Sequence, residues 1–180
     1  MSVYDEDGIR TVFQRNLESA KSNLAELEVF CGRKADFGGL SGWVFEQTIQ
    51  YCLQKELDAR GLSHDMKEQQ PLDGRAKVDL LIGGRLAIEI KSRGLFGRTD
   101  IERYRRYSEA AKQHGLVYLF LTASESYQPY RDGIADAVGR EGVFFLDVVG
   151  SWDRFLMRIV NELCPDERRL MDPKSCSHPL

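Results

Sequence analysis

The segment at residues 78–94, VDLLIGGRLAIEIKSRG, restricts the possible folds more than any other part of the sequence. Two runs of branched aliphatic residues flank a glycine pair, which is the pattern of a β-hairpin in a buried sheet. Asp79, Glu89 and Lys91 interrupt these runs, and burying an unpaired charge costs free energy. The hairpin therefore needs surroundings that keep its three charges paired or hydrated.

Alternation along each strand assigns these charges to one side. Successive side chains point to opposite faces of a sheet, so Asp79 is expected on one face of its strand, and Glu89 and Lys91 on one face of theirs. The apolar side chains expected on the core face are those of Val78, Leu80, Ile82, Leu86, Ile88 and Ile90.

Turn length decides whether the two carboxylates share a face. A two-residue loop at 83–84 pairs Asp79 with Ile88 and sends Glu89 to the opposite face. A three-residue loop at 83–85 pairs Asp79 with Glu89, and its glycines supply the positive φ that such loops need. We expect the three-residue or a bulged turn, which brings the carboxylates together.

The rest of the pattern predicts an α/β fold. The order is helix, helix, strand, hairpin, helix, strand, helix, strand, helix, which implies a mixed sheet with helices on both faces. Ser41 is the expected N-cap of the second helix and Gly61 its stop, with Glu46 at the edge of the buried stripe. Helices are expected at 9–31, 43–60, 99–113, 130–138 and 152–163, and further strands at 64–70, 116–122 and 143–147.

Composition limits the functional classes. The 180 residues suit one domain, with 42% hydrophobic and 29% charged residues. No apolar run approaches the ~20 residues of a membrane helix, and the acidic N-terminus lacks the order of a signal peptide, so a cytoplasmic location is expected. A net charge of −3 excludes binding to nucleic acid by overall charge alone. The four cysteines lack metal-site spacing and are expected to be reduced thiols.

Two carboxylates ~5 Å apart repel each other unless a cation lies between them. Carboxylate oxygens favour Mg²⁺ or Mn²⁺ over zinc. Lys91 shares the face of Glu89 and can reach the same point, where it would hold a phosphate oxygen or stabilise developing charge. The set suits metal-assisted hydrolysis of a phosphodiester.

Asp79, nine intervening residues and then Glu89-Ile90-Lys91 resemble the motif of the PD-(D/E)xK, or restriction-endonuclease-like, nuclease superfamily. Glu46, in the context GLSGWVFEQTIQYCLQKELDARG, is similar to the acidic helix that precedes this motif. Over residues 40–147 the resemblance implies an α/β three-layer sandwich with an αβββαβ core and a mixed central sheet. The long N-terminal helix and the C-terminal helix would be additions to that core.

The resemblance also implies roles for individual residues. Asp79 and Glu89 would hold Mg²⁺, or Mn²⁺ in its place, with the Ile90 carbonyl as the third ligand. Lys91 would be the catalytic lysine and Glu46 an outer ligand or water contact. The segment PLD at residues 71–73 is the less favoured source of the motif's first acidic residue, because it is expected to lie in a turn. The alternative to a nuclease site is that this short motif occurs here by chance. Glu89 and Lys91 would then form an ion pair on an exposed sheet edge.

The segment after the hairpin, KSRGLFGRTDIERYRRY, is basic and suits phosphate contacts. On the helix that it begins, one face carries Ile101, Tyr104, Ser108 and Ala111, and the opposite face carries arginines and a tyrosine. A Q-x-x-x-Y motif of some superfamily members is matched only in part here, which puts a RecB-type exonuclease in doubt. A solvated helix face is the alternative to the nucleic-acid contacts expected from Ser92, Arg93, Arg98, Arg103, Arg106 and Tyr107.

The function expected from this resemblance is that of a Mg²⁺-dependent DNA endonuclease, of the restriction or defence type. A structure-specific repair nuclease or Holliday-junction-resolving nuclease is the alternative, and a non-catalytic nucleic-acid-binding domain is the alternative of another class. We expect a homodimer. The expected organisation is an N-terminal amphipathic helix (1–32) for packing or dimerisation, the nuclease domain (33–164) and a flexible tail (165–180).

Overall fold

The computed structural model describes residues 2–31, 39–62, 64–73 and 76–164 of the 180-residue chain. Its helices are α1 (Glu6–Cys31), α2 (Leu40–Ala59), α3 (Arg98–Gln113), α4 (Gln128–Val138) and α5 (Ser151–Leu163), with a 3₁₀ turn, η1, at Arg140–Gly142. Its strands are β1 (Met66–Asp73), β2 (Ala76–Ile82), β3 (Leu86–Lys91), β4 (Val117–Thr122) and β5 (Val143–Phe145). The expected tail and the junction between the first two expected segments lie outside the described residues.

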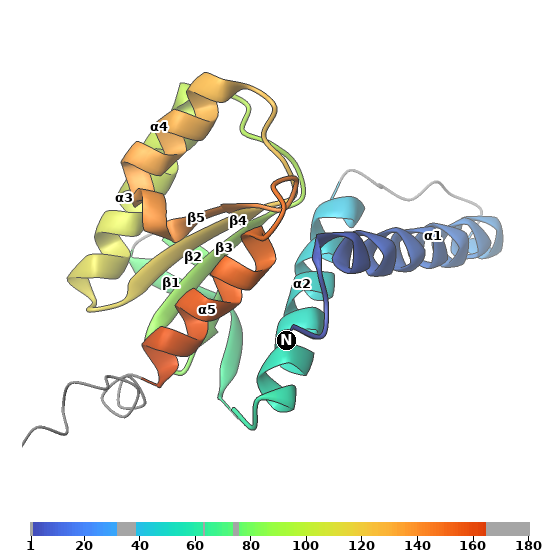
Figure 1. The fold of residues 1–180 in the computed structure, drawn as a ribbon. Helices are drawn as coiled ribbons and strands as arrows, with labels where there is room; N and C mark the ends of the chain where they lie inside the picture. Colours follow the sequence, from blue (N-terminus) through green and yellow to red (C-terminus); the bar gives the residue numbers. More distant parts are fainter. Residues whose placement is uncertain (1, 32–38, 63, 74–75, 165–180) are drawn as a thin grey trace, which may run out of the picture.

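The strands form a sheet in the order β1-β2-β3-β4-β5 (Figure 1). The sheet is mixed, as the element order predicted. Strand β2 is antiparallel to both β1 and β3, whereas β3, β4 and β5 are parallel to one another. The parallel pairs are joined through α3 and α4, as crossover connections require. Strand β3 is therefore a central strand, and the alternative of an exposed sheet edge for Glu89 and Lys91 is wrong.

Helices cover both faces of this sheet. On one face, α2, α5 and the start of α1 pack against β2, β3 and β4 in a core that includes Ile49, Ile88 and Trp152. On the other face, α3 and α4 enclose a second core around Tyr104 and Phe120. The α/β class with a mixed, two-sided sheet is thus confirmed, and no described helix is long and apolar enough to cross a membrane.

Helix α1 packs only through its beginning. Ile9 is the one buried side chain among those described in α1, and the Phe13 ring meets Phe45 of α2 edge-on at 5.2 Å between centroids. Beyond this contact α1 runs away from the sheet (Figure 1). Its later apolar residues include Leu17 and Leu24, which are half-buried, and Val29, which is 85% exposed.

Several boundary predictions were wrong, and two of them concern the start of α2 and the end of β1. The N-cap of α2 is Gly39 rather than Ser41, which lies inside the first turn. Strand β1 continues through Pro71 to Asp73, where a turn was expected. A proline is compatible with this position because β1 is an edge strand and its outer side needs no ladder hydrogen bond.

The hairpin has the three-residue turn. Ile82 pairs with Leu86, the Arg85 N–H donates to the Ile82 carbonyl at 3.0 Å, and φ is 57° at Gly83 and 64° at Gly84. Positive φ is accessible to glycine at little cost. The predicted three-residue turn is therefore confirmed, and its register holds from Ile82–Leu86 to Leu80–Ile88, where regular pairing ends before Asp79 and Glu89.

Val78 departs from the predicted face. It packs in the core beneath α3, together with Ala87 and Tyr104, whereas Leu80 lies in the core beneath α2. The regular β2–β3 ladder ends at Leu80, and the facing region of β1 has a positive φ of 49° at Gln69. Strict alternation is interrupted between Val78 and Leu80 because strand pairing is irregular there.

Candidate active site

Three charged side chains of the hairpin meet at the end of β3. The Lys91 Nζ lies 2.6 Å from Glu89 Oε1 and 3.4 Å from Asp79 Oδ2. The Asp79 and Glu89 side chains are 10% and 5% exposed, against 30% for Lys91. The structure thus brings the predicted carboxylates to a common partner, with an ammonium between them.

Asp79 is fixed by two further hydrogen bonds. The Ile90 N–H donates to its Oδ2 at 2.7 Å, and the Gln69 Nε2 donates to its Oδ1 at 3.0 Å. Gln69 was not identified from the sequence, since a glutamine in a weakly predicted strand gives no signal of this contact. The Ile90 side chain lies in the core, although Ile90 also lines the pocket described below.

Glu89 is held in an unusual state for a carboxyl group. Burial raises its pKa to about 7, the Lys91 charge opposes this shift and the Asp79 charge adds to it. Its Oε2 is buried and has no hydrogen-bond partner among the described residues. A buried carboxylate oxygen without a partner is costly, and it is an available acceptor for a cation or a water.

Glu46 approaches from α2. Its pKa is raised to about 7, first by burial and then by the charge of Asp79, while Lys91 lowers it. The charges of Asp79 and Lys91 therefore both shift the pKa of Glu46, the predicted outer acid. No hydrogen bond or ion pair joins the Glu46 carboxylate to either of these two described side chains. A proton exchanges at such a group near neutral pH.

Lys91 stays charged. Burial opposes its ammonium form, but the neighbouring Glu89 and Asp79 outweigh this effect and raise its pKa. The Nζ also lies 6.0 Å from the centroid of the Tyr104 ring, within cation–π range. Tyr104, whose pKa burial raises to about 12, was predicted on the inner helix face but not as a neighbour of the site.

A pocket of about 290 Å³ opens beside these groups. It is bounded by the start of α2, the end of β3, the loop after β3 and the first turns of α3. Charged and aromatic side chains of this lining include Glu46, Lys91, Arg93, Phe96, Arg103 and Tyr104. A cavity of this size and polarity suits a phosphate and part of a nucleotide.

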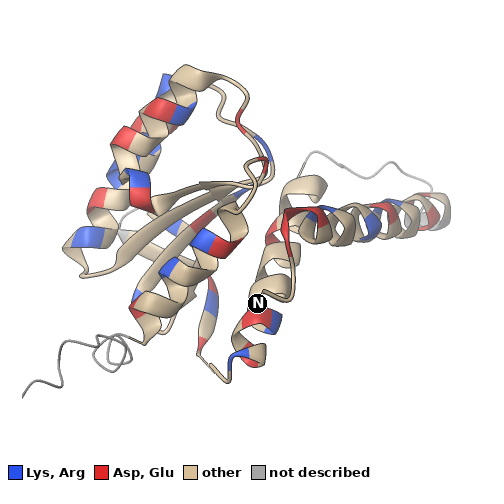
Figure 2. Cartoon of the chain, in the orientation of Figure 1, with Lys and Arg blue, Asp and Glu red and all other residues tan. Residues whose placement is uncertain are grey.

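The predicted phosphate contacts divide into two groups. Ser92, Arg93 and Arg103 line the pocket together with Lys91, whereas Arg98, Arg106 and Tyr107 do not. The predicted faces of α3 are confirmed, because its buried residues are Ile101, Tyr104, Ser108 and Ala111. Acidic and basic residues occur together in α3 and α4 (Figure 2), and in α3 the Asp100 Oδ1 lies 3.4 Å from the Arg103 Nη1.

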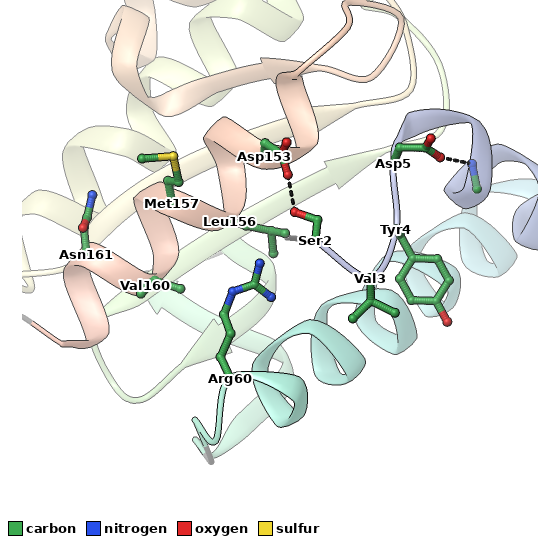
Figure 3. A pocket seen from close by; sticks show the side chains of 11 residues that line it. Ser2, Val3, Tyr4, Asp5, Arg60, Asp153, Leu156, Met157, Val160 and Asn161 are labelled. Atoms are coloured by element: carbon green, nitrogen blue, oxygen red, sulfur yellow. Dashed lines mark hydrogen bonds between the residues drawn. The ribbon is translucent and has the colours of Figure 1, made fainter.

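A larger cavity, about 740 Å³, lies elsewhere, between the N-terminal residues, Arg60 of α2 and α5 (Figure 3). It contains none of the predicted site residues. Beneath it, the buried Glu56 carboxylate accepts hydrogen bonds from the Tyr4 N–H at 2.8 Å, from the Trp152 indole at 3.4 Å and from Arg60. These contacts tie the start of the chain to α2 and α5, so we assign them a structural role.

The donor set fits a divalent cation in part. Within the described ranges, no three His, Cys, Asp or Glu side chains converge closely enough to hold a metal ion by themselves. Two carboxylates do converge on Lys91, and the Glu89 Oε2 is an orphaned buried acceptor. Such a set can hold Mg²⁺ or Mn²⁺ when water supplies the remaining ligands, as Mg²⁺ sites commonly do.

Comparisons of this chain with protein-family models, with curated proteins and with solved structures found no match. Its function must therefore be inferred from the site itself.

Proposed function

We propose that this protein is a Mg²⁺-dependent DNA endonuclease with a restriction-endonuclease-like fold. The observation that carries the proposal is the pair of buried carboxylates, Asp79 and Glu89, on adjacent strands with the Lys91 ammonium between them. The resemblance of these residues to the PD-(D/E)xK motif supports it. The helix, three strands, helix, strand order from α2 to β4 is also the order that this resemblance implies.

Each residue has a chemical task in this proposal. Asp79 and Glu89 would hold the cation, which when bound polarises the scissile phosphate and lowers the pKa of water. The Lys91 ammonium would stabilise the negative charge that develops on the phosphate oxygens. Glu46, with a pKa of about 7, would exchange a proton with water near neutral pH.

Charge in the pocket would position the DNA backbone. Arg93 and Arg103 line the same pocket as Lys91 and are both exposed. Guanidinium groups bind phosphate oxygens through two parallel hydrogen bonds. These contacts give orientation rather than sequence information. Arg98, Arg106 and Tyr107 are proposed to contact the backbone further from the pocket.

The decisive experiment is incubation with supercoiled, linear, single-stranded and four-way-junction DNA, in Mg²⁺ and in EDTA. Cleavage in Mg²⁺ that is lost in EDTA and in Asp79→Asn is expected. Asp136→Asn is the matched control, since Asp136 is an exposed α4 residue paired with Arg140, a surface contact of little energetic weight. Full activity of Asp79→Asn would overturn the proposal.

The substrate panel also separates the alternatives. Preferential cleavage of the four-way junction would identify a junction-resolving or repair nuclease. DNA binding without cleavage under any metal condition would identify a non-catalytic nucleic-acid-binding domain. Cleavage of supercoiled DNA first to nicked and then to linear product is the expected behaviour of the endonuclease.

We further propose that the protein acts as a cytoplasmic homodimer through α1. Beyond its contact with α2, this helix leaves Leu17 and Leu24 only half-buried and Val29 exposed. A dimer with two-fold symmetry would have two active sites, one for each strand of a DNA duplex. Light scattering should give the mass of a dimer at micromolar concentration, and a monomer there would contradict this assignment.

A further inference from the structure

The loop between β3 and α3 carries an exposed aromatic residue at the mouth of the candidate site. Phe96 is 72% exposed, yet it lines the same pocket as Lys91 and Glu46. An exposed phenylalanine on a loop contributes nothing to the core. Its position beside a proposed phosphate site raises the question of what it contacts.

The loop is held rigidly from beneath. The buried Glu125 carboxylate, 4% exposed, accepts hydrogen bonds from the Leu95 N–H and from the Tyr127 N–H, the latter at 3.0 Å. A Cβ added at Gly94 would lie 2.6 Å from Glu125 Oε2, so only glycine allows this close approach. The chain just before Phe96 is therefore fixed to the β4–α4 connection.

Phe96 itself is fixed from the other side. Its N–H donates to the Asp100 Oδ2 at 2.8 Å, which ties the loop to the first turn of α3. Ordering a loop before a ligand arrives removes part of the entropic cost of binding. The backbone that carries the exposed ring is thus held by hydrogen bonds on both sides of the loop rather than being free.

One face of the ring is already occupied. The Arg93 guanidinium lies over Phe96, with its Cζ 4.5 Å from the ring centroid. A ring that inserts as a wedge between two stacked base pairs needs both faces free. Because Arg93 covers one face, Phe96 can stack on only one planar group, such as a nucleobase. The Arg93 guanidinium would then contact the phosphate next to that base.

We propose that Phe96 is a stacking platform for one unpaired nucleobase next to the scissile phosphate, so that the protein prefers DNA with an unpaired nucleotide there. This inference rests on the proposed nuclease function and names its substrate class. Stacking of a base on an aromatic ring is tolerant of sequence, because every base has a π-face. A base inside a duplex cannot reach the ring without leaving its stack.

The test measures binding without catalysis. A duplex with a short single-stranded overhang that contains 2-aminopurine is titrated with protein in EDTA, beside the same duplex with a blunt end. Wild type should change the 2-aminopurine fluorescence on binding and prefer the overhang. Phe96→Ala should lose that signal and bind the overhang about 5- to 150-fold more weakly, while its blunt-duplex affinity changes by less than about twofold. Phe96→Trp should keep both properties.

Tyr51→Ala is the matched control. Tyr51 is 48% exposed with the Lys55 Nζ 5.7 Å from its ring centroid, so it is also an exposed aromatic beside a cation, but it does not line the pocket. Its substitution should leave the overhang preference unchanged. Equal wild-type affinity for the two duplexes, an equal loss on both in Phe96→Ala, or no DNA binding at all would overturn the platform.

The two proposals fail in different ways. Cleavage in Mg²⁺ with no preference for unpaired DNA would overturn the platform and leave the nuclease assignment standing. A Phe96-dependent preference in a protein that never cleaves would support the platform and overturn the nuclease assignment.

Discussion

The Ile90 N–H donates a hydrogen bond to the Asp79 carboxylate, with 2.7 Å between N and Oδ2. The regular β2–β3 ladder ends at Leu80 and Ile88, two residues before Ile90. A carboxylate therefore takes the place of a ladder partner at this point of β3. Hydrogen bonds to ionised acceptors are stronger than neutral ones, so Asp79 is oriented by the sheet itself.

Replacing Asp79 should separate its structural from its chemical task. Asp79→Asn keeps an oxygen for the Ile90 N–H, and we expect the free energy of unfolding to change by less than about 1 kcal/mol. Asp79→Ala leaves a buried N–H without an acceptor and should cost about 1–3 kcal/mol. Urea denaturation measures both values, and equal costs would show that this hydrogen bond does not matter.

Lys91 should be required for charge balance as well as for activity. Lys91→Met leaves two buried carboxylates without their ammonium. Breaking a buried pair costs about 3–5 kcal/mol, and because the Lys91 side chain is 30% exposed we expect a smaller loss, about 1–3 kcal/mol at pH 7. Lys91→Arg should restore stability but not DNA cleavage. Unchanged stability of Lys91→Met in urea denaturation would contradict the role in charge balance.

Cation binding should depend on Glu89. Calorimetric titration of Mn²⁺ should show one site in wild type, and Glu89→Gln should weaken it by more than about tenfold, since a carboxylate ligand is replaced by a neutral amide. Glu109→Gln, an exposed α3 residue outside the pocket, is the control and should bind as wild type does. The same affinity in all three proteins would rule out Glu89 as a ligand.

Glu56 should make the protein sensitive to acid. Burial opposes its charge, but hydrogen bonds from Arg60, from the main chain of Tyr4 and Val3 and from Trp152 outweigh burial and lower its pKa. The unfolded chain therefore binds more protons than the folded one as pH falls below the usual carboxyl pKa. The stability that Glu56 contributes is present above that value and is lost as pH falls through the lowered one.

Urea denaturation between pH 7 and pH 3 measures this effect. Glu56→Gln should be less stable than wild type at pH 7, by about 1–3 kcal/mol, and should lose less on acidification. Glu18→Gln, an exposed residue of α1, should follow the wild-type curve. Parallel curves for wild type and Glu56→Gln would contradict the lowered pKa.

Gly94→Ala should disturb the loop after β3. Its new Cβ would lie 2.6 Å from Glu125 Oε2 and 2.9 Å from Glu125 Cδ, so the carboxylate or the loop must move. Overpacking of this kind costs about 1–3 kcal/mol. Gly42→Ala is the control in the same pocket, because its added Cβ would meet only the Ser92 Oγ at 3.9 Å, an ordinary contact, and alanine suits a position inside α2. Equal stability of the two variants would argue against the close packing.

The hairpin was predictable because its information is local. Glycines at 83–84 fix the turn, and the turn fixes which residues face each other across it. Helical spacing likewise predicted which residues of α3 are buried. Both features depend on residues close in sequence.

Contacts between distant segments were not predictable. Glu125 supports the loop after β3 from a different connection, 30 residues beyond Leu95, and nothing in its surroundings marks it as a partner. Gln69 reaches Asp79 only because β1 pairs with β2. Val78 changes sides at an irregularity that alternation alone cannot anticipate. The placement of Pro71 in a strand became clear only with β1 at the sheet edge.

Asp79, Glu89 and Lys91 all belong to one hairpin, and this affects the order of folding. Contacts between residues close in sequence form with little loss of loop entropy, and hairpins close within microseconds. The parallel pairing of β3 with β4 must wait for the intervening α3. We therefore expect the like charges of the two carboxylates to come together while the hairpin is still surrounded by water. The Lys91 ammonium, two residues after Glu89, would then be in place before the surrounding helices exclude the solvent.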